Sequence, residues 1–438
     1  MSKSKQHEFS RRDFLRYTAT GAAAATVITP AKAAAAKTNA KIVIIGAGAG
    51  GTSAANRLVN RLEGAQITII DPRPDHLYQP GLSLVAAGLK PASYVTSKTT
   101  DWIPNGVNLI AEKAMSIDPE ARKVTTEQGK NLDYDFLIVA PGLVLDHDSI
   151  EGFSTDLIGK YGIGSLYAGP KYAARTWEAA SKFIETGGEG IFTRPATEMK
   201  CAGAPIKHAF LIDDLSRRAG NRGKANITYA AHSKSLFGVP IVAEKIRMLF
   251  ADRGIESAYS HVLQSVDPGS KRAVFQTPEG LQERDYDYLH VIPPQRAPQV
   301  VRDSGLSWND KWVDQGWVEC DKYTLQHLRY DNIWALGDVA GVPKGKTAAS
   351  VKFQVPVVVD GIVSQIEGRE LKEHYNGYTS CPMITKIGRA MLIEFDYNND
   401  LTPSFPGIIA PLEELWISWL MKEVALKPTY NAMLRGLA

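Results

Sequence analysis

Residues 41–51, KIVIIGAGAGG, join a short apolar run to a cluster of glycines. The run 41–45 is typical of a buried parallel strand, and Gly46, Gly48 and Gly51 match the pattern G-x-G-x-x-G. In that pattern the first glycine permits a tight turn, the second lets the backbone approach a pyrophosphate, and the third lets a helix pack on the strand. The stretch therefore predicts the start of a dinucleotide-binding domain.

The residues after the glycines extend this pattern. Residues 52–62 predict a helix whose N-terminus carries the partial positive charge that holds phosphate. A second apolar strand over 66–70 ends at Asp71, twenty residues beyond Gly51, where an acid bonds a ribose hydroxyl. Strand, glycines, helix, strand and acid in this register indicate a dinucleotide site far more strongly than the glycines alone.

Two later strands indicate which dinucleotide binds. The segments 134–142 and 332–338 each read as a strand that ends in a small-residue turn, the second at Gly337-Asp338. Both resemble the secondary signatures of flavoproteins with two dinucleotide-binding domains, in which the aspartate bonds the ribityl chain of FAD. We therefore expect FAD, with Asp338 at its ribityl chain.

The middle of the chain has strands but no second glycine fingerprint. Residues 190–192 and 227–231 read as strands, and the segment 193–197, TRPAT, follows the first of them. A nicotinamide nucleotide is thus a poor candidate for the electron donor. A plain NADH:quinone reductase is the weakest hypothesis for this reason.

Composition and charge exclude several classes of function. The chain has 438 residues, of which 44% are hydrophobic, and a formal net charge of only +3. That length predicts two or three domains, and the balanced charge argues against a nucleic-acid partner. No run reaches the roughly 18 consecutive apolar residues of a membrane-spanning helix. The histidines and cysteines show no metal-ligand spacing, so we expect no metal site.

The first 36 residues read as an export signal. Arg11 and Arg12 form a twin-arginine motif, a weakly apolar stretch follows over 17–28, and the segment 31–33, AKA, fits a cleavage site. The alternative is a disordered basic tail. A twin-arginine signal predicts a periplasmic protein that crosses the membrane already folded, often with its cofactor bound.

Two of the three cysteines occupy reactive settings. Cys201 lies between Lys200 and Lys207, in a small-residue turn that should open a helix, and both features lower a thiol pKa. Cys381 lies in a turn before an apolar run. The sequence leaves open whether the two meet, and for any single cysteine a small buried hydrophobe is the alternative. Cys320, at a predicted strand end, reads as structural.

The chain from residue 41 to residue 436 resembles the sulfide:quinone oxidoreductases, in particular the branch that includes the mitochondrial enzymes. The stretches KCAGAP at 200–205 and YTSCP at 378–382 are specific to that family, much more so than the glycine fingerprint. Further matching stretches are 76–81, 237–239, 289–294, 337–338, 345–349 and 395–397.

The resemblance implies a mechanism. Cys201 and Cys381 would form a redox-active bridge beside the flavin, and hydrosulfide would attack it, leaving one cysteine as a persulfide and the other as a thiolate. Electrons would pass through FAD to membrane quinone, and the sulfane sulfur would go to a small thiol or a sulfite-like nucleophile. We assign Cys381 to the flavin side and Cys201 to the persulfide.

The resemblance also implies the cofactor residues. It places the adenosine ribose at Asp71, the adenine at the backbone of Ala114, and a flavin edge at Lys346, whose charge would stabilise the reduced ring. The implied catalytic residues are Cys201 and Cys381. The expected FAD-binding residues are Gly46, Gly48, Ala49, Gly50, Gly51, Asp71, Gln79, Ala114, Gly337, Asp338 and Lys346.

A helix that touches the bilayer is expected near the C-terminus. Over 411–425 apolar residues recur at helical spacing on one face, and Trp416 and Trp419 suit an interfacial helix. The alternative is a helix packed on the protein's own core or on a dimer partner. The apolar set is Leu412, Leu415, Trp416, Trp419, Leu420 and Val424, with Glu413, Ser418, Lys422 and Glu423 largely opposite.

These expectations combine into an α/β fold of two Rossmann-like domains, with the FAD domain split around the middle one, and a membrane-facing helical appendage. The predicted parts are the signal 1–36, FAD-domain segments 37–145 and 301–375, a middle domain 146–300, and a redox-cysteine and membrane region 376–438. The resemblance implies a periplasmic enzyme that is peripherally associated with the inner membrane. Whether it forms a homo-oligomer stays open.

Two alternative functions remain. The flavoprotein subunit of a sulfide dehydrogenase that donates to cytochrome c usually tethers FAD through a cysteine near Tyr78 and Gln79, where this chain has none. A flavin-binding redox sensor or persulfide carrier would keep Cys201 and Cys381 but would reduce no quinone.

Overall fold

A parallel sheet of five strands carries the glycine stretch, in a computed structural model that describes residues 35–437. The strands stand in the order β22-β11-β2-β4-β7, and all neighbours are parallel. Their bounds are β2 Lys41–Ile45, β4 Gln66–Ile70, β7 Asn108–Ile110, β11 Phe136–Val139 and β22 Ile333–Ala335. Because β22 follows the whole middle segment in sequence, the FAD domain is split around that segment, as predicted.

The export signal cannot be followed in this structure. The predicted signal 1–36 falls almost entirely on residues 1–34, which lie outside the described residues. The described part, from residue 36 onward, forms one compact unit.

The helix after the glycines begins earlier than predicted. α2 spans Ala49–Arg61 rather than 52–62, so that Gly50 and Gly51 lie in its first turn. A side chain on Gly51 would collide with the carbonyl oxygen of Gly46. The strand and the helix can approach this closely only because the residue is glycine.

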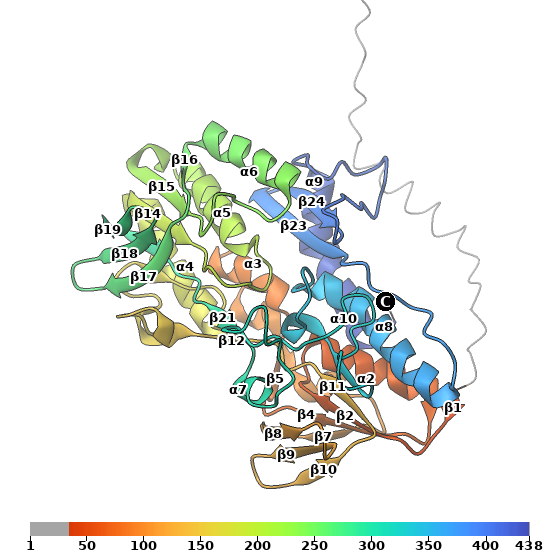
Figure 1. Cartoon of the computed structure of the whole chain (residues 1–438). Helices are drawn as coiled ribbons and strands as arrows, with labels where there is room; N and C mark the ends of the chain where they lie inside the picture. Colours follow the sequence, from red (N-terminus) through yellow and green to blue (C-terminus); the bar gives the residue numbers. More distant parts are fainter. Residues whose placement is uncertain (1–34, 438) are drawn as a thin grey trace, which may run out of the picture. The chain divides into compact units, whose positions relative to one another are not determined.

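A second long helix covers the sheet beside α2 (Figure 1). α8 spans Ala348–Glu367 and buries most of its residues. Thr347 caps it, since its Oγ1 accepts a hydrogen bond from the backbone N–H of Ser350 at 3.1 Å. α8 therefore ties the loop after β22 to the sheet.

The middle domain has its own parallel sheet, in the order β13-β20-β14-β15-β16. β14 begins at Gly188, two residues before the predicted strand 190–192. The strands are β13 Ile163–Gly164, β14 Gly188–Thr193, β15 Ala225–Ala230, β16 Ile255–Ala258 and β20 Tyr288–His290, and the helices are α4 Pro170–Thr186, α5 Ala204–Arg218 and α6 Pro240–Arg253.

Shorter elements complete both domains. Two antiparallel three-stranded sheets are inserted in them: β8 Ala114–Asp118, β9 Lys123–Thr126 and β10 Asn131–Asp133 in the first, and β17 Val262–Asp267, β18 Arg272–Thr277 and β19 Gly280–Asp285 in the second. Two-stranded pairs are β1 Ala36–Lys37 with β3 Leu62–Glu63, β5 Asp75–Leu77 with β6 Thr96–Lys98, and β12 Val144–Leu145 with β21 Gln295–Arg296. Short helices are η1 Gln79–Gly81, α3 Leu82–Ala86, α7 Gln299–Arg302 and η7 Gly337–Val339.

The C-terminal region starts with an antiparallel hairpin that packs on α5 (Figure 1). Its strands are β23 Thr379–Lys386 and β24 Arg389–Phe395, and Cys381 pairs with Ile393. Cys381 thus lies inside a strand, not in the predicted turn. The apolar run that follows it in sequence is the continuation of the same strand.

The C-terminal helix is present, but it presents a different face from the one predicted. It begins at Trp416 and continues through α9 Trp416–Leu420, the π-helical turn η8 Met421–Ala425 and α10 Leu426–Leu434. Ser418 and Lys422, expected on the polar face, are buried, whereas Val424 is 58% exposed. Trp419 packs with Leu84 in the protein's own core, which agrees with the alternative of a helix packed on that core.

Among residues 35–437, no helix combines the length and the apolar character that crossing a bilayer requires.

The close contact of Gly51 with Gly46 predicts a stability difference between two alanine variants. Gly51→Ala should lower the free energy of unfolding by about 1–3 kcal/mol, since the new methyl group overlaps backbone. Gly48→Ala is the matched control, because its methyl group would not overlap any backbone atom of residues 35–437. The nearest atom would be a side-chain nitrogen of Arg73 at 3.8 Å. Urea unfolding of the cofactor-free chains measures both, and equal midpoints would contradict the packing argument.

Candidate active site

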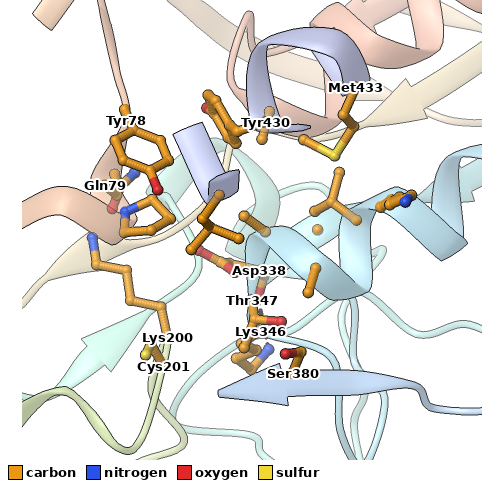
Figure 2. A pocket seen from close by; sticks show the side chains of 18 of the residues that line it. Tyr78, Gln79, Lys200, Cys201, Asp338, Lys346, Thr347, Ser380, Tyr430 and Met433 are labelled. Atoms are coloured by element: carbon orange, nitrogen blue, oxygen red, sulfur yellow. Dashed lines mark hydrogen bonds between the residues drawn. The ribbon is translucent and has the colours of Figure 1, made fainter. Parts of the chain in front are cut away.

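A cavity of about 490 Å³ lies at the carboxyl ends of β2, β11 and β22. Figure 2 shows that the C-terminal helix contributes Tyr430 and Met433 to one side of it and that the turn at Cys201 contributes to another. Of the residues predicted from the sequence, it is lined by Gly48, Ala49, Gly50, Gln79, Cys201, Gly337, Asp338 and Lys346.

Five predicted residues do not line this cavity. Gly46 and Gly51 lie beneath the turn, where they allow the backbones to meet. Ala114 begins β8 and packs at the edge of the main core, away from the cavity. Asp71 and Cys381 lie behind residues that do line it, so the structure does not confirm direct cofactor contacts for any of the five.

Asp71 supports the glycine turn from behind. Its Oδ2 accepts from the backbone N–H of Ala47 at 2.6 Å, and its Oδ1 accepts from the backbone N–H of Arg73 at 2.8 Å. Burial works to raise the pKa of Asp71, but the hydrogen bonds from Arg73 outweigh it and hold the pKa below its ordinary value. The Arg73 side chain lines the cavity instead of the carboxylate.

The lining fits a dinucleotide. The first-turn N–H groups of a helix have no intrahelical acceptor, and no side chain of the described residues caps α2 at Gly48. A pyrophosphate placed there would accept from these donors. Tyr78 Oη and Gln79 Oε1 are buried without a partner within residues 35–437, and both belong to the lining. A bound polar cofactor would supply hydrogen-bond partners for these two oxygen atoms.

Lys346 holds the turn that presents Asp338. Its ammonium donates to the carbonyl oxygens of Asp338 at 2.6 Å and Ala340 at 3.1 Å, and it lies 3.8 Å from the ring centroid of Trp317. Burial lowers the pKa of Lys346 to about 8. The predicted place near a flavin edge therefore comes with a second role, which is to fix the backbone around Asp338.

Lys200 also lines the cavity, although its sequence position marked it only as a neighbour of Cys201. Its side chain extends toward Gln79 in Figure 2, with the ammonium 4.8 Å from the ring centroid of Tyr167. Burial lowers the pKa of Lys200 to about 8. Tyr167 Oη donates to the backbone carbonyl of Lys200 at 3.0 Å, so it holds this turn in place. The KCAGAP stretch was the available signal for Lys200.

The two predicted redox cysteines meet. Both are free thiols in the described part of the chain, and they are hydrogen-bonded to each other. Cys201 has a left-handed backbone, with φ of 43°, and its N–H donates to the Lys346 carbonyl at 2.9 Å. A non-glycine residue held in that region stores strain, which is common where a side chain must be aimed at a reaction site.

Lys207 provides the charge next to the pair. Its ammonium donates to Cys201 Sγ at 3.3 Å. The hydrogen bond with Cys381 and then the charge of Lys207 lower the pKa of Cys201 well below its ordinary value, against the effect of burial. The same hydrogen bond, together with burial, raises the pKa of Cys381. Cys201 is thus the thiolate of the pair and Cys381 the thiol.

The two cysteines differ in their exposure to the cavity. Cys201 lines the cavity, whereas Cys381 is 3% exposed and belongs to the core of the middle domain. A methyl group on Gly203 would lie 2.6 Å from Cys381 Sγ and 3.6 Å from the Phe237 ring. β23 therefore directs Cys381 away from the cavity, so the placement of Cys381 on the flavin side stays a prediction that this geometry does not favour.

Cys320 takes no part in this site. It is buried in the main core, and burial raises its pKa to about 12, as for an inert thiol. No cluster of three or more metal-ligating side chains occurs among the residues that the structure describes.

A second cavity, of about 570 Å³, lies at the carboxyl ends of β14 and β15 in the middle domain. Its lining includes Arg194, Arg247 and Phe237. Arg194 Nε and His232 Nδ1 are buried there without a hydrogen-bond partner in the described range. Phe237 belongs both to the lining of this cavity and to the apolar cluster that contains Cys381.

The fold and the site together define a class. A helix N-terminus for pyrophosphate, a cavity along a split sheet and a thiol pair at its edge are the parts of an FAD-dependent disulfide-type oxidoreductase, and residues 40–165 match the family described as pyridine nucleotide-disulphide oxidoreductase. The solved structure of the sulfide:quinone oxidoreductase from Aquifex aeolicus has the same fold, with a TM-score of 0.76 over 91% of this chain and 92% of that chain, at 22% identity.

Curated relatives narrow the class to one family. The chain is 35% identical over 398 residues to the mitochondrial sulfide:quinone oxidoreductase of Dictyostelium discoideum, which covers 90% of this chain and 86% of the relative. It is also 35% identical over 405 residues to the protein of the same name from Mus musculus, which covers 92% and 88%. The chain belongs to the sulfide:quinone oxidoreductase family.

Proposed function

We propose that this protein oxidises sulfide to sulfane sulfur through Cys201, Cys381 and FAD, and passes the two electrons to quinone. The observation that carries the proposal is the thiol pair itself, in which a lysine-stabilised Cys201 lines the cofactor cavity and Cys381 lies directly behind it. The names of the relatives, sulfide:quinone oxidoreductase, agree with this chemistry.

The geometry assigns separate roles to the two sulfurs. With the pair oxidised to a disulfide, hydrosulfide attacks the sulfur of Cys381, the S–S bond breaks, and Cys381 becomes a persulfide while Cys201 leaves as a thiolate. Lys207 stabilises that thiolate at the cavity wall. The bound FAD supplies the two-electron chemistry that connects this thiolate to quinone.

Three cysteine variants test the proposal. Sulfide added anaerobically to the FAD-loaded protein should bleach the flavin absorbance, and Cys201→Ser and Cys381→Ser should each slow bleaching at least about 100-fold. Cys320→Ser is the matched control, because its buried thiol lies apart from the pair, and it should bleach at the normal rate.

A native flavin that stays oxidised under excess sulfide would overturn the proposal and favour the sensor or carrier. Flavin that remains on the acid-precipitated protein would favour the covalently tethered sulfide dehydrogenase subunit. Turnover with a soluble quinone distinguishes the enzyme from a carrier that bleaches only once.

We further infer that the sulfur acceptor reaches Cys381 from the second cavity. Arg194 makes this cavity suitable for an anionic nucleophile, such as sulfite or the carboxylates of a small thiol, and Phe237 belongs both to its lining and to the apolar cluster around Cys381. The acceptor would attack the outer sulfur of the Cys381 persulfide and carry it away, leaving a Cys381 thiolate.

This route predicts a selective effect of one arginine. Arg194→Gln should raise the KM for sulfite about tenfold or more, because its guanidinium faces the cavity, while flavin bleaching by sulfide stays unchanged. Arg247→Gln is the control, since that guanidinium is already paired with Glu244 at 2.7 Å. Steady-state kinetics with sulfite measure both, and equal KM values for the two variants would contradict the route.

We propose that the mouth of the cofactor cavity faces lipid. Phe353 and Phe405 line the cavity and are also exposed, and Ile408, whose N–H donates to the Phe405 carbonyl, is 78% exposed. Trp416, exposed at the start of the C-terminal helix, belongs to the same class of large apolar surface side chains. Such residues suit a protein that takes a hydrophobic quinone from the surface of a bilayer.

We also propose a periplasmic location, which is supported by the motif at residues 10–15 and the cleavage pattern at 31–33. Replacing Arg11 and Arg12 with Lys should block export, because the twin-arginine pathway reads this pair. Fractionation of expressing cells should find the normal chain with the membranes. Protease added to intact spheroplasts should degrade the exported normal chain and spare any chain that has not been exported. If the double variant is found in the same cell fractions as the normal chain, the result would count against this signal.

A further inference from the structure

The C-terminal helix changes its pitch at one place. η8, Met421–Ala425, is a π-helical turn between two α-helical segments, and such turns occur frequently at functional sites. Lys422 lies in this turn and is 2% exposed. Its ammonium donates to the Pro80 carbonyl at 2.7 Å and lies at the wall of the cofactor cavity. Lys422 lies four residues after Ser418 and three after Trp419, which are also buried, so it shares their inward-facing side of the helix.

Lys422 faces charged and titratable groups from several elements. They are Lys207 of α5, Cys201 in the turn before α5, Cys381 of β23, and Tyr78, whose ring centroid lies 6.0 Å from the ammonium. Burial lowers the pKa of Lys422 to about 7 and Lys207 lowers it too, while negative charge on the cysteines raises it.

The coupling also acts in the opposite direction. The pKa of Cys201 is lowered first by its hydrogen bond with Cys381, then by Lys207, and also by the charge of Lys422. Burial alone would lower the pKa of Lys207, but the Cys201 thiolate raises it. The two ammonium groups therefore repel each other and are both stabilised by the same sulfur.

A buried ammonium is costly unless acceptors or an anion compensate it. The Pro80 carbonyl satisfies one of the three donors of Lys422. The thiolate supplies the negative charge that one neutral carbonyl does not. The sulfur pair thus explains why a lysine is stable at this position.

We propose that Lys422 is a positioning residue that completes, with Lys207, a cradle of two ammonium groups around the Cys201 thiolate, since all three residues line the same cavity. The inference rests on the proposed function only in that the cysteine pair is the reactive group. Its consequence is that the C-terminal segment, which also walls the cofactor cavity, must be docked for the thiolate to be fully stabilised.

The test measures the thiol and not turnover. The FAD-loaded protein is reduced with dithiothreitol and desalted anaerobically, and the rate of Cys201 alkylation by iodoacetamide is followed from pH 5 to pH 10 by peptide mass spectrometry. In Lys422→Met and Lys422→Gln the profile should shift to higher pH, with alkylation at neutral pH about tenfold slower, which corresponds to one pKa unit. Gln keeps a donor for the Pro80 carbonyl but removes the charge.

Lys427→Met is the matched control. Lys427 is five residues further along the same helix, and its ammonium donates to the Tyr94 carbonyl at 2.6 Å, but it is not part of the lining of the cofactor cavity. This variant should lose a similar tether and keep the normal alkylation profile. A Lys422 profile that overlays the Lys427→Met profile would falsify the proposal. Because the assay contains neither sulfide nor quinone, it can fail or succeed independently of the proposed function.

Discussion

One backbone hydrogen bond connects the parts on which the site depends. The N–H of Cys201, in the turn before α5, donates to the carbonyl of Lys346, in the loop after β22, at 2.9 Å. The same lysine donates its ammonium to the Asp338 carbonyl. The reactive thiol of the middle domain and the predicted ribityl-binding residue of the FAD domain are therefore fixed to a single residue, which keeps both at one cavity.

Buried charge is the second constraint, and the site balances it locally. Lys207 is a cation removed from water, and the Cys201 thiolate is the anion that keeps it protonated. Removing one partner of such a pair leaves an uncompensated charge, which costs more than the intact pair contributes. The low thiol pKa needed for sulfur chemistry and the tolerance of a buried lysine thus have the same physical origin.

Much of the site could be predicted from local patterns. Gly46 and Gly51 are recognisable because close backbone approach excludes a side chain at both positions, and Asp338 is recognisable because it follows an apolar strand. Lys207 and Cys201 are near neighbours on one helix start. Which of the two cysteines borders the cavity could not be predicted, since this depends on how β23 packs against α5. Lys422 was assigned to the polar face because charged side chains are mostly exposed, whereas it is buried on the same inward side as Ser418.

The sequence by itself determined the α/β class, the glycine turn, the split domain and the family, because each rests on a short-range pattern or on a resemblance that runs along the chain. Only the tertiary structure decided that Cys201 and not Cys381 lines the cavity, that Asp71 supports the turn from behind, and that the C-terminal helix turns a lysine inward. These outcomes depend on contacts between segments far apart in sequence, where packing and burial, rather than local preference, set the orientation of a side chain.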